Sequence, residues 1–129
     1  MLESNAALQR EALATLAQAR LATGSAQQAL RFAERAVADL GPSDEAHIGE
    51  SLVRLSYALA LDAVGRGALA RIAVQHATRR LFERAEKMAE PAQRVSFLAG
   101  VPESAQLIEL ARQWQLAPVR ETPSAEPVS

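Results

Sequence analysis

The chain has 129 residues, of which 49% are apolar and 4% aromatic, and its formal net charge is −1 with no cysteine. This length suffices for one domain with a buried core. The balanced charge argues against nucleic acid as a partner, and the absence of cysteine excludes disulfides, thiolate catalysis and zinc sites built on cysteine. Ala and Leu dominate the apolar residues, which favours closely packed helices and an all-α fold.

The apolar runs are too short to cross a membrane. The N-terminus also lacks the charged and then apolar pattern of a signal peptide. We therefore expect no membrane partner and, by default, a cytoplasmic protein.

A first helical hairpin is predicted over residues 5–40. Ser4 or Asn5 can cap its first helix, and Gly24 follows the end of that helix. Ser25 then begins the returning helix in a capping-box arrangement. The first helix carries two neighbouring apolar rows, which are Leu8, Ala12 and Leu16, and Leu13, Ala17 and Leu21.

A second hairpin is predicted over residues 44–89. Ser43 can cap its first helix, although Gly49 weakens the first turns and allows a start near Glu50. Gly65 can adopt the left-handed conformation that closes this helix before the chain returns. Helical spacing predicts that the buried positions of the two helices are Ile48, Leu52, Leu55 and Leu59, and then Leu69, Ile72, Ala73, His76, Ala77 and Leu81.

Two terminal helices are predicted over residues 91–115, each opened by a proline. In the first, Val95 and Leu98 are expected to face inward. In the second, the expected buried residues are Leu107, Ile108, Ala111 and Trp114. Residues 1–117 thus form one helical domain of about six helices, and the polar, Pro-rich segment 118–129 is expected to be a disordered tail.

The two hairpins repeat one another in sequence. Aligning Gly24 with Gly65 places Ala29, Ala33 and Ala36 over Ala70, Val74 and Ala77, which are the small residues that two crossing helices need. This pattern resembles the tetratricopeptide repeat. The resemblance is carried by Leu13, Leu16, Ala17, Gly24, Ala29 and Ala36 in the first unit and by Tyr57, Ala58, Leu61, Gly65, Ala70 and Ala77 in the second. It implies antiparallel hairpins stacked in a right-handed α-superhelix.

The C-terminal part of the chain carries a second resemblance. Residues 93–114 include Arg94, the pair Phe97-Leu98 and the run Val101-Pro102-Glu103, followed by a Leu-rich helix. This order is similar to the terminal segment of helical-repeat regions in large bacterial ATPase-linked and SARP- or LuxR-like transcriptional activators. The resemblance implies that the chain corresponds to the C-terminal portion of such a bacterial regulator.

Catalytic and metal-binding constellations are not predicted. His47 and His76 lie far apart in sequence, with no serine or cysteine spaced to form a catalytic pair, and the carboxylates lie mostly in first turns or near arginines. We therefore expect a protein that is not an enzyme and that needs no cofactor or metal.

In the repeat family, the first helix of each hairpin lines a concave binding groove. That geometry implies a groove for a protein or peptide partner, lined here by Glu11, Ala14, Gln18, Leu21, Leu52, Leu55, Leu59 and Asp62. The alternative is that these leucines belong to the core. The apolar face of the first helix also has no evident cap, so we expect it to form a homodimer or to join further repeats.

The leading functional hypothesis is a non-catalytic protein–protein interaction module, a scaffold or adaptor, within a bacterial regulatory protein. The alternative is a regulatory ligand- or peptide-sensing domain of a transcriptional regulator. Nucleic-acid binding is a weaker option: its cations would be Arg79, Arg80, Arg84 and Lys87, but Glu83 and Glu86 alternate with them.

Overall fold

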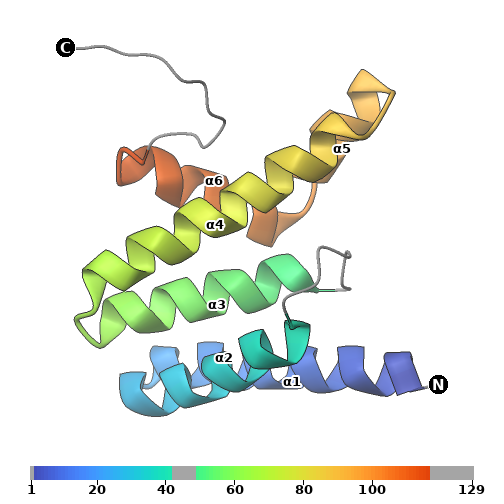
Figure 1. Cartoon of the computed structure of the whole chain (residues 1–129). Helices are drawn as coiled ribbons and strands as arrows, with labels where there is room; N and C mark the ends of the chain where they lie inside the picture. The colour runs from blue at the N-terminus through green and yellow to red at the C-terminus, as the bar shows by residue number, and fades with distance from the viewer. Residues whose placement is uncertain (1, 42–48, 117–129) are drawn as a thin grey trace.

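The computed structural model describes residues 2–41 and 49–116, and over these ranges the chain is all-helical (Figure 1). This confirms the predicted all-α fold of six helices. The helices are α1 (Leu2–Ala22), α2 (Ala26–Leu40), α3 (Glu50–Ala63), α4 (Gly67–Glu86), α5 (Pro91–Ala99) and α6 (Pro102–Gln113). The predicted tail, the Ser43 cap and His47 lie outside the described residues.

Helices α1 and α2 form one antiparallel pair, and α3 and α4 form the next (Figure 1). Each pair is joined by a tight turn in which a glycine has a left-handed backbone, Gly24 with φ 86° and Gly65 with φ 88°. L-residues with a side chain adopt this conformation at a cost, so glycine is suited to both turns.

Helix α3 is the centre of the arrangement, because it contacts α1, α2, α4 and α6. Helices α2 and α4 flank it, and their backbones do not approach each other closely. Helix α6 packs on both α3 and α4, while α5 lies against α4 and α6. The end of α6 is further tied to α4 by a hydrogen bond of 2.7 Å from Arg71 Nη2 to the carbonyl oxygen of Trp114.

The core consists largely of small side chains. Between the two hairpins, the buried residues are Ala17, Ala29, Leu30, Ala33, Ala60, Leu61 and Ala70. Between α3, α4 and α6 they are Leu55, Ala77, Leu81 and Leu107. The six small residues that the repeat alignment superposes are all 0–1% exposed, and small side chains at these positions allow the helix backbones to approach closely.

Three apolar residues that were predicted to face inward are exposed instead. Leu69 and Ile72 of α4 are 48% and 59% exposed, and Val95 of α5 is 65% exposed. The predicted positions Ala77 and Leu81 are buried, but they share their stripe with Ala70 and Val74, and a helix cannot turn this stripe and Leu69 and Ile72 toward α3 together. In α5 the residues that pack on the core are Phe97 and Leu98.

Helix ends also differ from the sequence predictions. Helix α1 begins at Leu2, before the expected caps Ser4 and Asn5, and Ser25 forms no side-chain capping hydrogen bond at the start of α2. Helix α3 begins at Glu50, which is the later of the two starts predicted from the sequence. It follows Gly49, whose backbone is left-handed with φ 76°.

Candidate functional site

The eight residues predicted to line a concave groove do not form one open surface. Ala14 is 0% and Leu55 is 2% exposed, so the prediction that these two side chains contact a partner is wrong. Both belong to the core. For Leu55, this agrees with the alternative interpretation that the leucines of this set are core residues. The small volume of Ala14 lets α1 and α3 approach, and the Ser56 hydroxyl lies 3.4 Å from the Ala14 carbonyl oxygen.

The other six predicted groove residues lie at varied depths. The Gln18 side chain donates a hydrogen bond of 3.0 Å to the Ser56 hydroxyl, which joins α1 to α3. The half-buried leucines that pack against the core are Leu21, Leu52 and Leu59. Glu11 and Asp62 are exposed. Of these six residues, Leu52 also lines the pocket between α3, α4 and α6 that is described below.

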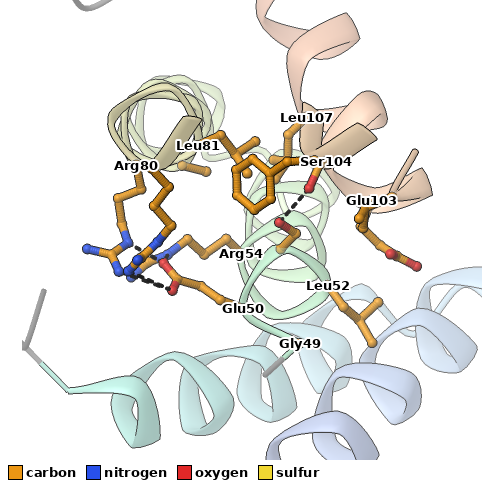
Figure 2. A pocket seen from close by; sticks show the side chains of 14 residues that line it. Gly49, Glu50, Leu52, Arg54, Arg80, Leu81, Glu103, Ser104 and Leu107 are labelled. Carbon is orange, nitrogen blue, oxygen red and sulfur yellow. Dashed lines mark hydrogen bonds and ion pairs between the residues drawn. The ribbon is translucent and has the colours of Figure 1, made fainter. Parts of the chain in front are cut away.

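A buried ion-pair cluster lies where α3 begins. Glu50 is the first residue of α3, and its side chain is only 11% exposed. Its carboxylate accepts a hydrogen bond of 2.7 Å from Arg54 Nε, one turn along the same helix. Arg80 of α4 donates to both carboxylate oxygens, to Oε2 through Nε and to Oε1 through Nη2 at 3.1 Å. Arg84 Nη2 lies 3.9 Å from Oε1, so three guanidinium groups surround one carboxylate (Figure 2).

This arrangement keeps Glu50 ionised. Burial alone would raise the pKa of its carboxyl group, because a charged group is less stable away from water. Hydrogen bonds from Arg80 and Arg54, with their positive charges, outweigh that effect and lower the pKa from 4.5 to about 2. The cluster therefore joins α3 to α4 through a charge that persists over nearly the whole pH range of a folded protein.

The cluster forms one side of a pocket of about 220 Å³ between α3, α4 and the α5–α6 corner. We call it the arginine pocket. Its remaining lining is mainly apolar, with Leu52, Leu81, Phe97, Val101 and Leu107. Ser51 and Ser104 also belong to the lining, and their hydroxyls are hydrogen-bonded at 2.9 Å, which fixes α6 against α3 (Figure 2). The pocket thus combines a charged end, where Glu50 is paired with arginines, with an apolar end.

A second depression lies on the other side of Arg54, in the gap between α2 and α4. We call it the α2–α4 groove. Its volume is about 350 Å³, and its lining residues are Val37, Gly41, Arg54, Tyr57, Leu69, Ile72, Ala73 and His76. Helix α3, which packs against both α2 and α4, contributes Tyr57 and Arg54 to the lining. The exposed Leu69 and Ile72 lie beside one another, one turn apart, at the α4 wall.

His76, at one end of this groove, is surrounded by more positive than negative charge. Partial burial lowers the pKa of its imidazole, and the positive charges of Arg54, Arg80 and Arg79 lower it further, while Glu50 acts in the opposite direction. His76 is therefore neutral at pH 7. Helical spacing placed His76 among the buried positions, whereas its side chain is only partly covered by the protein and is exposed to solvent.

The described residues do not assemble a metal site. No group of three or more His, Asp or Glu side chains within residues 2–41 and 49–116 is arranged to hold a metal ion. In the same part of the chain, no helix has the length and apolar character that a membrane span requires.

Comparisons with protein-family models, with curated proteins and with solved structures gave no significant match to this chain. The tetratricopeptide and regulator resemblances therefore stay predictions.

Sequence reasoning missed both depressions. It considered Glu50 only as a possible helix start, and Arg80 and Arg84 only as cations for nucleic-acid binding, because residues 30 positions apart show no local pairing signal. The spacing of Glu50 and Arg54, four residues apart on one helix, was the detectable part. The groove was missed because Leu69 and Ile72 were expected to belong to the core.

Proposed function

We propose that the chain is a non-catalytic protein-interaction module that binds an apolar peptide segment in the α2–α4 groove. The observation that carries this proposal is the pair Leu69 and Ile72, two large apolar side chains about half exposed beside a concave, mainly apolar surface. Contiguous apolar surface of this kind marks binding sites, whereas isolated exposed apolar residues do not.

The groove also favours a particular partner chemistry. Its lining contains Arg54 and His76 and, among the described residues, no carboxylate. Since His76 is neutral at pH 7, the positive charge of Arg54 is what would attract an acidic side chain next to the apolar residues of the partner. We therefore expect a helix or extended segment with spaced apolar residues and an acidic neighbour.

Peptide selection tests this function and does not require the natural partner. A random peptide library displayed on phage is selected on the immobilised protein, and enriched peptides are synthesised and titrated by fluorescence anisotropy. We expect spaced apolar residues and affinities weakened by at least about tenfold in Ile72→Glu, which corresponds to about 1.4 kcal/mol.

The matched control is Val95→Glu, which changes an equally exposed apolar residue on α5 far from the groove lining. This variant should bind like the wild type. Selection that yields no peptide sensitive to Ile72→Glu, or peptides equally sensitive to Val95→Glu, would contradict the proposed site.

A second candidate function is ligand sensing within a bacterial regulator. It is favoured by the arginine pocket, where polar groups converge on a partly enclosed apolar space, the usual form of a small-molecule site.

A further inference from the structure

We infer that the partner of the α2–α4 groove is helix α1 of a second copy of this chain. The outer face of that helix, which carries Leu8 and Leu16, packs on the apolar wall of the groove, and its Glu11 lies toward Arg54. The inference rests on the proposed function, because it assigns a partner to the same groove.

The outer face of α1 is apolar and exposed. The inner face is buried against α2 and α3, as at Ala14. On the outer face, Leu8 is 63% and Leu16 is 42% exposed, and Ala12 and Thr15 between them are exposed as well. Steps of three and four residues return to one side of a helix, so these four side chains form one continuous surface. We call it the α1 row.

The α1 row and the groove have similar lengths. Leu8 and Leu16 lie about 12 Å apart along the helix axis, at a rise of about 1.5 Å per residue. The α4 wall of the groove runs from Leu69 to His76, which is about 10 Å by the same rise. Ala12, at the middle of the row, is small and allows a second helix surface to approach closely. The groove therefore accommodates about two turns of α1.

Charge favours this contact over the two symmetric ways of pairing the same surfaces. Among the described residues, the groove lining contains Arg54 and no carboxylate, whereas Glu11 is exposed at the edge of the α1 row, one turn after Leu8. Two paired α1 rows would bring two Glu11 carboxylates to one interface, and two paired grooves would bring together two Arg54 guanidinium groups. Like charges oppose association, and the α1 row in the groove brings Glu11 to Arg54 instead.

The contact joins two different surfaces, so each copy offers both an α1 row and a groove to other copies. A variant that lacks one of the two surfaces cannot associate with itself in this way. It retains, however, the surface that a variant lacking the other one needs. Two variants that are each monomeric should therefore associate when they are mixed.

Isothermal titration calorimetry of two complementary variants tests the inference. Leu16→Glu disrupts the α1 row and Ile72→Glu disrupts the groove, and both residues are exposed, so folding should be retained, as circular dichroism would verify. We expect Ile72→Glu titrated into Leu16→Glu to give saturable binding at a ratio of one to one. Either variant titrated into itself should give only the heat of dilution. The double variant lacks both surfaces and is the matched control, which should bind neither single variant.

The role of Glu11 is tested within the same titration. Glu11→Lys, added to the Ile72→Glu protein that supplies the α1 row, should weaken binding to Leu16→Glu by at least about fivefold, which is about 1 kcal/mol. Glu90→Lys makes the same change of charge at an exposed residue before α5, on neither of the two surfaces, and should leave the affinity unchanged. Equal effects of the two charge changes would contradict the assigned contact of Glu11.

Three results would overturn the inference. The first is an absence of binding between Leu16→Glu and Ile72→Glu. The second is self-association of Ile72→Glu as strong as that of the wild type, which would show that α1 pairs with α1. The third is the same result for Leu16→Glu, which would show that the groove pairs with itself. If library peptides bind in an Ile72-dependent way while the mixed variants do not associate, the inference fails and the proposed function stands.

Discussion

Replacement of Glu50 by glutamine should destabilise the protein in a pH-dependent way. The pKa of Glu50 is about 2 in the folded protein, compared with an ordinary value of 4.5. A carboxyl group whose folded pKa is depressed stabilises the fold above its unfolded pKa, and this stabilisation is lost as the pH falls through its folded pKa. At about 1.4 kcal/mol per pKa unit, the ionised carboxylate contributes on the order of 3 kcal/mol at pH 7.

The magnitude agrees with the structure of the cluster. Removing one partner of a buried ion pair typically costs about 3–5 kcal/mol, because the remaining charges stay buried without compensation. In Glu50→Gln, the guanidinium groups of Arg54 and Arg80 lose the carboxylate that they share, although each is at most 14% exposed. A loss of about 3 kcal/mol is a large part of the about 5–15 kcal/mol that stabilises a typical domain.

Urea unfolding of the wild type and Glu50→Gln at pH 7, 3 and 2 measures this effect. The difference in unfolding free energy should be about 3 kcal/mol at pH 7, about 1.4 kcal/mol at pH 3 and less than about 0.5 kcal/mol at pH 2. Other carboxyl groups titrate in both proteins and cancel in the difference, provided that the m-values agree.

Glu83→Gln is the matched control, because the Arg79–Glu83 pair joins the same residue types but both side chains are more than half exposed. Its effect should stay within about 0.5 kcal/mol at every pH. If the difference in unfolding free energy between the wild type and Glu50→Gln stays constant from pH 7 to pH 2, the stabilising role given to ionised Glu50 is refuted.

Three further predictions follow from the described contacts. Exposed Leu16 on α1 should contribute to a homodimer, so light scattering coupled to size-exclusion chromatography should give a mass near twice 13.8 kDa. Leu16→Glu should lower this mass to that of the monomer. A wild-type protein that stays monomeric at high concentration would contradict this prediction. Asp39→Ala should lower the unfolding free energy by about 1–3 kcal/mol, because it removes the 3.2 Å ion pair between Asp39 and Arg10. The Nε atom of Arg10 is already buried without a hydrogen bond. An unchanged free energy of unfolding in urea would contradict this prediction. Gly65→Ala should cost about 1 kcal/mol because φ is 88°. Gly67 is the first residue of α4 and has open space for a Cβ atom, so Gly67→Ala should be neutral or stabilise by up to about 1 kcal/mol. Equal thermal shifts for the two variants would contradict this prediction.

The sequence was sufficient to predict the fold class, because the signals for helix ends are local. Gly24 and Gly65 have the left-handed backbones that helix termination requires, and the six helices lie close to their predicted ranges. The repeat alignment was also informative for the core: it identified Ala70, Val74 and Ala77 as helix-crossing positions, and all three are buried.

The direction in which each helix faces was harder to predict, since several helices carry more than one apolar stripe. In α4, spacing alone favoured Leu69 and Ile72, but close packing on α3 requires the small side chains of the neighbouring stripe. Sequence spacing cannot decide between two such stripes, because the choice depends on the shape of the helix packed against them. The same limit explains why the predicted groove included Leu55, which is buried.

The arginine pocket depended on contacts that no local pattern encodes. Glu50 meets Arg80 and Arg84 only after α3 and α4 pack antiparallel, and the Ser51–Ser104 hydrogen bond joins residues 53 positions apart. An acidic first-turn residue and a helix with alternating charges are each typical of solvated surfaces. Their burial became apparent from the tertiary structure.

The central claim is that the α2–α4 groove is a peptide-binding surface, and its most direct test is a chemical-shift titration. A uniformly ¹⁵N-labelled protein is titrated with a peptide selected from the library, and amide shifts are followed in heteronuclear single-quantum spectra. The account predicts that the largest shifts cluster at Val37, Tyr57, Leu69, Ile72, Ala73 and His76. Shifts that cluster instead on the exposed row of α1, or around Phe97 and Leu107 in the arginine pocket, would contradict it.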